Sequence, residues 1–266
     1  MSETSDLPNG FQERLRQRQA LRSRPLETIP LDGVAQTHGN IPNTPLAAAL
    51  ISFLLGSVFA LGTLTFLCGG FSQFWWSTYQ AGFFVAAWAA FHWGEFAVTA
   101  GWNREKCSVD SFLLDNGALY HIANGLALFE YLTTVFWKSS MKQYPYLSTL
   151  GVVMVIFGQA LRSAAMIRAS TNFSHSVAFR KRETHELVTD GVYAYCRHPS
   201  YAGFFYWALG TQLVLQNPFS FIVFVALLWR FFQKRVEAEE KALVGFFGQA
   251  YVDYRNKIGT MIPFIR

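Results

Sequence analysis

Charged residues are scarce in this chain of 266 residues: Asp, Glu, Lys and Arg together make up 15% of it, whereas about 25% is usual for a soluble domain. Hydrophobic residues make up 52% and include 26 Phe, 11 Tyr and 8 Trp. This composition excludes a disordered chain, a collagen and a coiled coil. Composition alone does not show a membrane protein, because what matters is where the apolar residues lie. Here the hydrophobic residues stand in long blocks with the charges between them.

The sequence also lacks the marks of nucleic-acid binding and of metal or disulfide sites. Its formal net charge is only +5, and no basic stripe interleaved with aromatic residues is present. Its three cysteines, Cys68, Cys107 and Cys196, are odd in number and show no metal-ligand spacing. We therefore expect no nucleic-acid partner, no disulfide framework and no metal site.

Five long blocks carry at most one charged residue each: 45–68, 74–102, 117–137, 146–166 and 201–229. A bilayer core about 30 Å thick is crossed by roughly 20 residues of helix. The last block is too long for one span, and Asn217-Pro218 in its middle is typical of a turn. The sequence therefore predicts an all-α, polytopic integral membrane protein with about six transmembrane helices, the last two forming a helical hairpin at about 201–216 and 218–234.

The distribution of basic residues predicts the topology. With the N-terminus in the cytosol, the segments 1–45, 103–116, 168–199 and 230–266 would face it, and they contain 19 of the 22 Lys and Arg residues. The other loops contain only Lys138 and Lys142. Because Lys and Arg accumulate in cytoplasmic loops, we expect both termini in the cytosol.

The first 40 residues are polar and Arg-rich. They contain no apolar run, so we expect no signal peptide before the first span. They are typical of a disordered tail, or alternatively of a weak amphipathic helix on an anionic leaflet.

Polar motifs gather before and after the predicted hairpin. They are Asn172-Phe173-Ser174-His175, His185-Glu186-Leu187-Val188-Thr189-Asp190-Gly191-Val192-Tyr193, Arg197-His198-Pro199-Ser200-Tyr201 and Arg235-x-x-x-Glu239-Glu240. Both ends of a tight hairpin lie at the same membrane face. We therefore expect His198 and Arg235 to be neighbours at the cytosolic interface.

The charged residues in or near the spans could have a structural role instead of a role in a functional site. Arg235 and Glu239 stand four residues apart and could form a surface pair, although Arg before Glu is the weaker orientation. Their place at the exit of a span favours a site instead. Arg162 could pair with Glu95 or with Glu130, because ionisable groups within spans usually have a partner or a task.

The histidines near the spans could likewise have structural roles instead of binding a ligand. His92 and His121 stand on apolar faces, where we expect packing or interfacial roles. His198 precedes a proline and is held extended, which suits a ligand-lining loop. A plain helix N-terminus is equally consistent with that position.

Taken together, the polar motifs resemble the isoprenylcysteine carboxyl methyltransferases. Further elements of the resemblance are Ser111-Phe112-Leu113-Leu114-Asp115, Gly210-Thr211-Gln212, Asn217-Pro218, Phe246-Phe247-Gly248-x-x-Tyr251-x-x-Tyr254 and Pro263-Phe264-Ile265. The resemblance covers roughly residues 46–266. The Arg-His-Pro and Glu-Glu elements also occur in phospholipid methyltransferases and sterol reductases, whereas the Asn-Phe-Ser-His and Gly-Thr-Gln elements narrow the choice to the first family.

The resemblance implies transfer of a methyl group from S-adenosylmethionine to the C-terminal carboxylate of a prenylated cysteine. The partners it implies are prenylated proteins with a processed C-a-a-X end, such as small GTPases, and membrane lipid. It implies a multi-pass protein of the endoplasmic reticulum membrane whose active site faces the cytosol.

The resemblance also assigns residues. It places Arg235 on the substrate carboxylate as the catalytic and substrate-binding residue. The cofactor-binding residues that it implies are His185, Glu186, Leu187, Val188, Tyr193, His198, Pro199, Ser200, Tyr201 and Glu239. Together with the apolar blocks, these residues divide the chain into a polar cytosolic tail at 1–45, transmembrane helices 1–4 at 46–168, and a catalytic region at 169–266 with a cofactor-binding loop, the hairpin and a cytosolic C-terminal helix.

Elementary chemistry agrees with this interpretation. A C-terminal carboxylate has a pKa near 3.5, so at neutral pH it is already an anion and needs no general base. Proximity, orientation and a dry site then suffice. Three alternatives stay open: a phospholipid N-methyltransferase, a membrane sterol reductase, and a lipid transporter or non-catalytic prenyl-binding protein.

Overall fold

The computed structural model describes residues 41–178, 180–181 and 185–265, and this part of the chain is helical without named strands. Its long helices are α2 (Pro45–Leu67), α3 (Tyr79–Trp102), α4 (Ala118–Lys138), α5 (Pro145–Ala169), α6 (Pro199–Leu215) and α7 (Pro218–Phe247), followed by the short α8 (Gln249–Lys257). Short 3-10 helices lie between them: η1 (Arg104–Lys106), η2 (Val109–Phe112), η3 (Ser139–Lys142), η4 (Ser170–Asn172) and η5 (Gly191–Ala194). The all-α class is confirmed.

Each segment predicted to span the membrane is a helix in the structure. The stretches Pro45–Leu67 and Pro145–Asn172 are long and apolar enough by themselves to cross a bilayer. Large hydrophobic side chains point outward from the bundle; Phe53 is 72% exposed, Trp137 80% and Ile156 60%. The number of spans stays a prediction. The predicted tail at 1–45 lies almost wholly outside the described residues.

Helix starts follow from local sequence. The hydroxyls of Thr44 and Thr78 cap α2 and α3 by accepting from Ala47 N and Ala81 N, both at 3.2 Å. Proline stands in the first turn of α2, α5, α6 and α7, where its missing N–H costs no hydrogen bond.

The predicted hairpin of α6 and α7 is confirmed, and buried polar groups hold its turn. Gln216 adopts a left-handed conformation with φ 54°, and Lys142 donates to the Gln216 carbonyl at 2.7 Å and to the Asn217 side chain at 2.8 Å. The carboxylate of Glu130 accepts from the backbone nitrogens of Phe219 and Ser220 at 3.1 and 2.7 Å, so it caps α7.

Helices α5 and α6 pack backbone to backbone through glycines. A Cβ added at Gly158 would lie 2.5 Å from the Gly203 carbonyl oxygen and 2.6 Å from the Trp207 nitrogen. One turn further on, a Cβ added at Gly203 would meet the backbone nitrogen of Arg162 at 2.8 Å. This close approach brings Arg162 of α5 beside the first turn of α6.

Arg162 pairs with Glu95 of α3 and not with Glu130. Nε and Nη2 of Arg162 donate to the two carboxylate oxygens at 2.5 and 2.7 Å, and both side chains are buried. His92 is fully buried, with its ring nitrogens 2.7 Å from the Phe112 carbonyl oxygen and 2.9 Å from the Tyr120 hydroxyl. The packing role of His92 is confirmed, whereas His121 is exposed.

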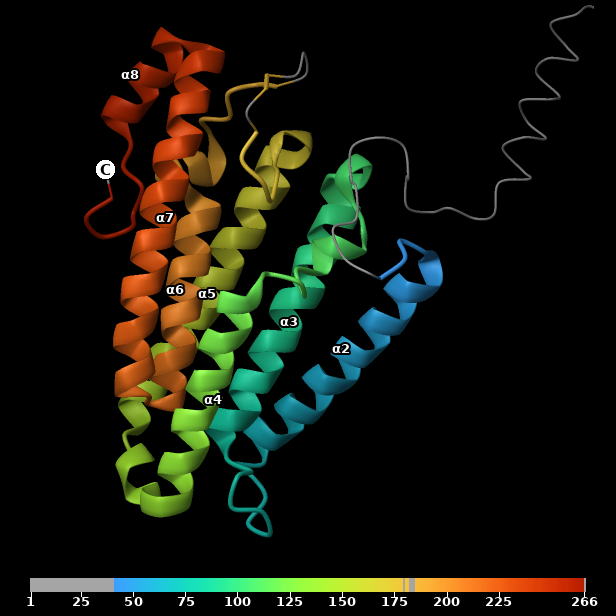
Figure 1. Cartoon of the computed structure of the whole chain (residues 1–266), viewed down its shortest axis with the longest axis vertical. Coiled ribbons are helices and arrows are strands. Elements are labelled where there is room, and N and C mark those ends of the chain that lie inside the picture. The colour runs from blue at the N-terminus through green and yellow to red at the C-terminus, as the bar shows by residue number, and fades with distance from the viewer. Residues whose placement is uncertain (1–40, 179, 182–184, 266) are drawn as a thin grey trace, which may run out of the picture.

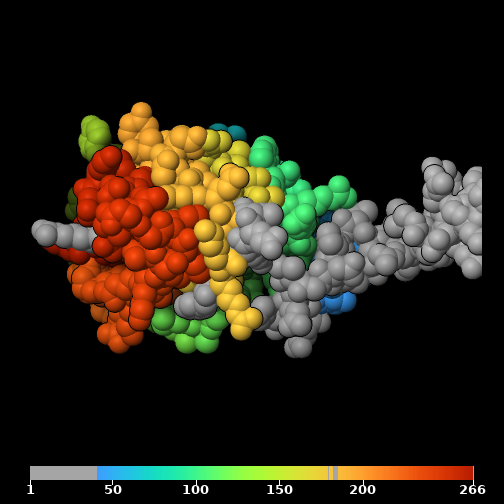
Figure 2. Space-filling view, turned by 90° about the horizontal axis from the view of Figure 1, so that it is seen from above, coloured from blue at the N-terminus to red at the C-terminus, as the bar shows by residue number. Residues whose placement is uncertain are grey.

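The polar segments meet at one end of the bundle. In Figure 1 the C-terminal half of α7, α8 and the chain between α5 and α6 lie together at the top. Figure 2 looks onto this end and shows α7 and α8 in red against the orange and gold chain before α6. Helix α7 continues to Phe247, beyond the apolar stretch expected to end near residue 234. It therefore carries Arg235 and Glu239 on one continuous helix.

Candidate active site

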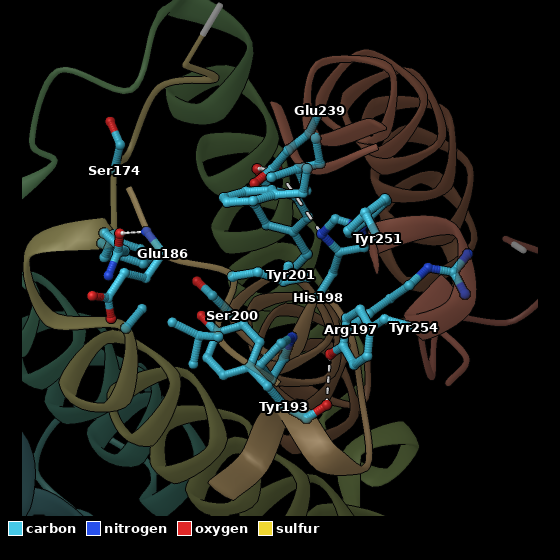
Figure 3. A pocket seen from close by; sticks show the side chains of 18 residues that line it. Ser174, Glu186, Tyr193, Arg197, His198, Ser200, Tyr201, Glu239, Tyr251 and Tyr254 are labelled. Carbon is cyan, nitrogen blue, oxygen red and sulfur yellow. Dashed lines mark hydrogen bonds and ion pairs between the residues drawn. The ribbon is translucent and has the colours of Figure 1, made fainter. Parts of the chain in front are cut away.

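A cavity lined by polar and aromatic side chains, called the polar cavity below, opens between the end of α5, the start of α6, and α7 and α8. Figure 3 shows side chains that line it. The lining residues are Ala169, Asn172, Phe173, Ser174, Glu186, Leu187, Val188, Tyr193, Arg197, His198, Pro199, Ser200, Tyr201, Glu239, Leu243, Phe247, Tyr251 and Tyr254. They include every residue expected to bind the cofactor except His185, whose ring lies 6.0 Å from that of Phe246, centroid to centroid.

A second cavity of about 340 Å³ lies deeper in the bundle, between α3, α4, α5, α6 and α7. Its walls are mainly apolar and aromatic, with Phe91, Phe204, Trp207, Phe224, Phe231 and Phe232 among them. Its polar end is formed by Arg162, His175, Ser200, Tyr201 and Arg235. Residues of both the expected transmembrane part at 46–168 and the expected catalytic region at 169–266 line it, so the site depends on both parts of the chain.

The two cavities meet at a junction, formed by the wall residues that they share: Phe173, Ser174, Ser200 and Tyr201. Two of these residues belong to the chain after α5, and two belong to the first turn of α6. A ligand in the polar cavity and one in the apolar cavity would therefore approach each other at the junction.

Tyr201 connects Arg235 and Glu239, the two side chains of α7 for which the sequence predicts roles at the site. Nε of Arg235 donates to the Tyr201 hydroxyl at 3.0 Å, and that hydroxyl donates to the carboxylate of Glu239. Among the ion pairs of the described residues, none joins Arg235 to Glu239. The alternative of a direct surface pair is therefore wrong: the two residues meet through Tyr201.

Arg235 carries a positive charge without a carboxylate partner in the described part of the chain. Besides Tyr201, its guanidinium donates to the carbonyl of His175, and it lies 5.6 Å from the centroid of the Tyr201 ring. Guanidinium groups bind carboxylates through two parallel hydrogen bonds. At the polar end of an apolar cavity, Arg235 is thus suited to bind an anion that carries a long apolar chain.

A buried hydrogen-bond network packs against Tyr201 and Glu239 and holds them in place. The carboxylate of Glu240 accepts from Arg197 at 2.5 Å and lies 3.1 Å from Nε2 of His198. The ring of His198 stacks on Tyr201 at 5.4 Å, and Figure 3 shows its other nitrogen facing Glu239, at 4.0 Å. Burial opposes ionisation of Glu240, but the hydrogen bonds from His198 and Arg197 outweigh it and lower the pKa of this carboxyl group.

The chain before α6 is tied to its neighbours. The side chain of Asn172 accepts from Glu186 N at 2.9 Å, and the Phe173 carbonyl accepts from the Asn103 side chain at 2.9 Å. Burial lowers the pKa of His175 to about 4, so its ring is neutral at physiological pH. The hydrogen bonds of Asn172 and Phe173 hold in place the loop that contributes Phe173 and Ser174 to the walls of both cavities.

Several residues at the site received no role from the sequence. Arg197 and Glu240 stand next to expected site residues, and Asn172, Phe247, Tyr251 and Tyr254 belong to motifs already noted. Only their place in or beside those motifs could have indicated that they belong to the site. Nothing in the sequence indicated Leu243. Among the described residues, no group of three or more His, Cys, Asp or Glu side chains could hold a metal ion.

Comparisons with known proteins agree with this geometry. Residues 151–245 match the model of the isoprenylcysteine carboxyl methyltransferase (ICMT) family. A protein-S-isoprenylcysteine O-methyltransferase of Mus musculus is 44% identical over 219 residues, covering 82% of this chain and 75% of that protein. One of Schizosaccharomyces pombe is 41% identical over 244 residues, covering 85% of this chain and 99% of that protein.

A solved structure is similar as well. It is described as the eukaryotic intramembrane Ras methyltransferase ICMT without a monobody, and it matches with a TM-score of 0.75 and 34% identity over 83% of this chain and 82% of that one. The likeness to an intramembrane enzyme and the two apolar helices identify a membrane protein. The resemblance seen in the motifs is confirmed, and this chain belongs to the isoprenylcysteine carboxyl methyltransferase family.

Proposed function

We propose that this protein methylates the C-terminal carboxylate of a prenylated cysteine, with S-adenosylmethionine as the methyl donor. The observation that carries the proposal is the junction of a polar and an apolar cavity. The guanidinium of Arg235, which has no carboxylate partner among the described residues, lies on the apolar side, and the carboxylate of Glu239 lies on the polar side. Membership of the family supports the same reaction.

The polar cavity suits a sulfonium cofactor. Glu239 offers a negative charge, and tyrosine rings line the wall, as expected for a site that holds a cation beside aromatic faces. The hydroxyl of Tyr251 is buried and has no hydrogen-bond partner among the described residues, so the wall offers a polar group that a ligand can use. When bound, S-adenosylmethionine would supply an electrophilic methyl group.

The apolar cavity suits a prenyl chain whose carboxylate lies at Arg235. Held there, the carboxylate oxygen would accept the methyl group as the carbon–sulfur bond of the cofactor breaks, so the negative charge of the carboxylate and the positive charge of the sulfonium would be neutralised in the same step. No proton is transferred, so the step needs no general base; among the described residues no Asp or Glu side chain lines the apolar cavity, and the ring of His175 is neutral. Arg235 binds and orients the carboxylate, and the surrounding aromatic rings exclude water.

We further propose that the protein spans the endoplasmic reticulum membrane with about six helices, and that both termini and the polar cavity face the cytosol. The bias of Lys and Arg supports this topology. The prenyl chain would enter from the bilayer between helices and the cofactor from the cytosol. The clients would be prenylated proteins with processed C-a-a-X ends, such as small GTPases.

An assay in membranes tests the proposed function. Labelled S-adenosylmethionine is supplied with N-acetyl-farnesylcysteine or with phosphatidylethanolamine, and the labelled product is measured. The proposal predicts label in the prenylcysteine only. Label in the phospholipid only would establish a phospholipid N-methyltransferase instead, which would need a way to remove a proton from the amine.

A further inference from the structure

The last described residues, 258–265, turn back toward the helical hairpin. They follow the polar helix α8, and Figure 1 shows them running from it along α6 and α7. Ile262 and Ile265 are buried in the same hydrophobic core as Phe205 of α6 and Phe232 of α7. The segment is therefore packed against the hairpin, whereas the distribution of charge along the sequence assigns it to the aqueous side of the membrane.

Hydrogen bonds from the start of α6 hold this segment in place. The hydroxyl of Tyr206 donates to the Met261 carbonyl at 2.7 Å, and the thiol of Cys196 donates to the Thr260 carbonyl at 3.0 Å. The hydroxyl of Thr260 in turn donates to the Ile265 carbonyl at 2.5 Å. The Cα of Tyr206 lies about 10 Å along the axis of α6 from its first residue. The segment thus extends beside α6 and not beyond its end.

Two large apolar side chains of the segment point away from the protein. Phe264 is 93% exposed and Met261 is 46% exposed. Both residues adopt a left-handed conformation, with φ 64° for Phe264 and 58° for Met261, which is costly for bulky side chains. Their chain neighbours Ile265 and Ile262 are buried, so adjacent side chains face opposite ways. The fold accepts backbone strain and still exposes apolar surface, an arrangement that water would disfavour.

The surroundings indicate that lipid covers these side chains. The ring of Tyr206 meets that of Phe157 edge-on, with 6.5 Å between centroids. Phe157 is 50% exposed on α5, a helix long and apolar enough to cross a bilayer. The surface around Met261 and Phe264 is therefore continuous with the lipid-facing surface of the bundle. Lys257 is exposed at the end of α8, where its ammonium group suits lipid phosphates.

We propose that residues 258–265 form an interfacial anchor, in which Phe264 and Met261 insert into the lipid leaflet on the side of the polar cavity. Apolar side chains beside a basic residue are typical of segments that lie in a membrane interface. The anchor also holds the polar cavity at the membrane surface. Arg197, in the wall of that cavity, donates from its backbone nitrogen to the Gly259 carbonyl at 3.0 Å and from Nη1 to the Ile258 carbonyl at 2.5 Å. This inference does not depend on which reaction the protein catalyses.

Site-directed labelling of the full chain in vesicles of phosphatidylcholine with a minor share of phosphatidylserine tests the anchor. Phe264→Cys is combined with Cys68→Ser, which removes the exposed cysteine, whereas Cys107 and Cys196 are buried. The new thiol is labelled with a fluorophore whose emission depends on polarity, and its quenching by phosphatidylcholine brominated in the acyl chains is measured. We expect blue-shifted emission and strong quenching by the brominated lipid.

Glu237→Cys in the same background is the matched control, because Glu237 is an exposed charged residue on the part of α7 beyond the apolar stretch. A charged, membrane-impermeant maleimide should modify Phe264→Cys about tenfold more slowly than Glu237→Cys, since charge is disfavoured among acyl chains. Met261→Cys should behave as Phe264→Cys does, and it takes the place of that variant if Phe264→Cys does not fold.

The outcomes distinguish lipid from other partners. Slow modification together with quenching by brominated lipid supports the anchor. Modification as fast as that of Glu237→Cys, without quenching, would show that the segment lies in water and would overturn it. Protection that develops only after a prenylated protein is added would also overturn it, because the segment would then be a docking surface for a protein.

Discussion

Replacement of Arg235 by lysine tests the substrate side of the site most sharply. Arg235 uses Nε on Tyr201 and one Nη on the His175 carbonyl, which leaves the rest of its five donors for a carboxylate. A lysine ammonium has three donors at one point, so it cannot contact Tyr201, His175 and two carboxylate oxygens together. At least one charge-assisted hydrogen bond is lost.

The size of the effect follows from that loss. A hydrogen bond to a charged group contributes about 1.5–3 kcal/mol, so kcat/KM for the prenylcysteine should fall by about 10- to 150-fold. Initial rates are measured while each substrate is varied in turn, and the KM for S-adenosylmethionine should change much less. Arg230→Lys, at an exposed position of the same helix, is the matched control. Near-normal turnover of Arg235→Lys would remove Arg235 from the substrate role.

The remaining predictions concern the cofactor, the prenyl cavity, the helix packing and pH. Glu239→Gln should raise the KM for S-adenosylmethionine more than that for the prenylcysteine, whereas the exposed Glu237→Gln should raise neither; equal changes would contradict charge balance by Glu239. Ala208→Trp, in the wall of the apolar cavity, should abolish prenylcysteine binding while S-adenosylhomocysteine still binds, and unchanged prenylcysteine binding would place the prenyl chain elsewhere. Gly158→Ala should destabilise the protein by about 1–3 kcal/mol through the clash with α6, whereas Gly245→Ala, which meets no atom within 4 Å, should be neutral or slightly stabilising. The pKa of Glu240 is lowered by folding, so its stabilising effect is complete above the ordinary pKa and is lost as the pH falls through the lowered value. Acidification below about pH 4.5 should therefore lower the melting temperature of the wild type more than that of Glu240→Gln; equal losses would show that Glu240 does not contribute.

The helices could be predicted from sequence because they are specified by long apolar runs and by proline. Asn217-Pro218 marked the hairpin turn, and the structure places the turn there. The sequence also predicts a cytosolic C-terminal helix after the hairpin, but it did not show that α7 runs without a break to Phe247, because the residues after 234 form a helix without an apolar run. In that segment neither the charged residues nor the helix propensities indicate where the helix ends.

The site could be predicted only as a set of residues, without its connections. A spacing of four placed Arg235 and Glu239 on one helix face but could not show that Tyr201 lies between them. Two glutamates were possible partners of Arg162, and only the packing of α3 against α5 selects Glu95. Contacts between residues far apart in the chain depend on how the helices are arranged, which apolar periodicity does not specify.

The chemical nature of the product tests the central claim most directly. Membranes containing the protein are incubated with N-acetyl-farnesylcysteine and S-adenosylmethionine labelled in its methyl group, and the product is treated with alkali. A methyl ester releases its label as volatile methanol, whereas an N-methyl group keeps it. We expect alkali-labile label that depends on the prenylcysteine and is strongly reduced in Arg235→Lys. Label that is stable to alkali, or that forms without the prenylcysteine, would contradict carboxyl methylation.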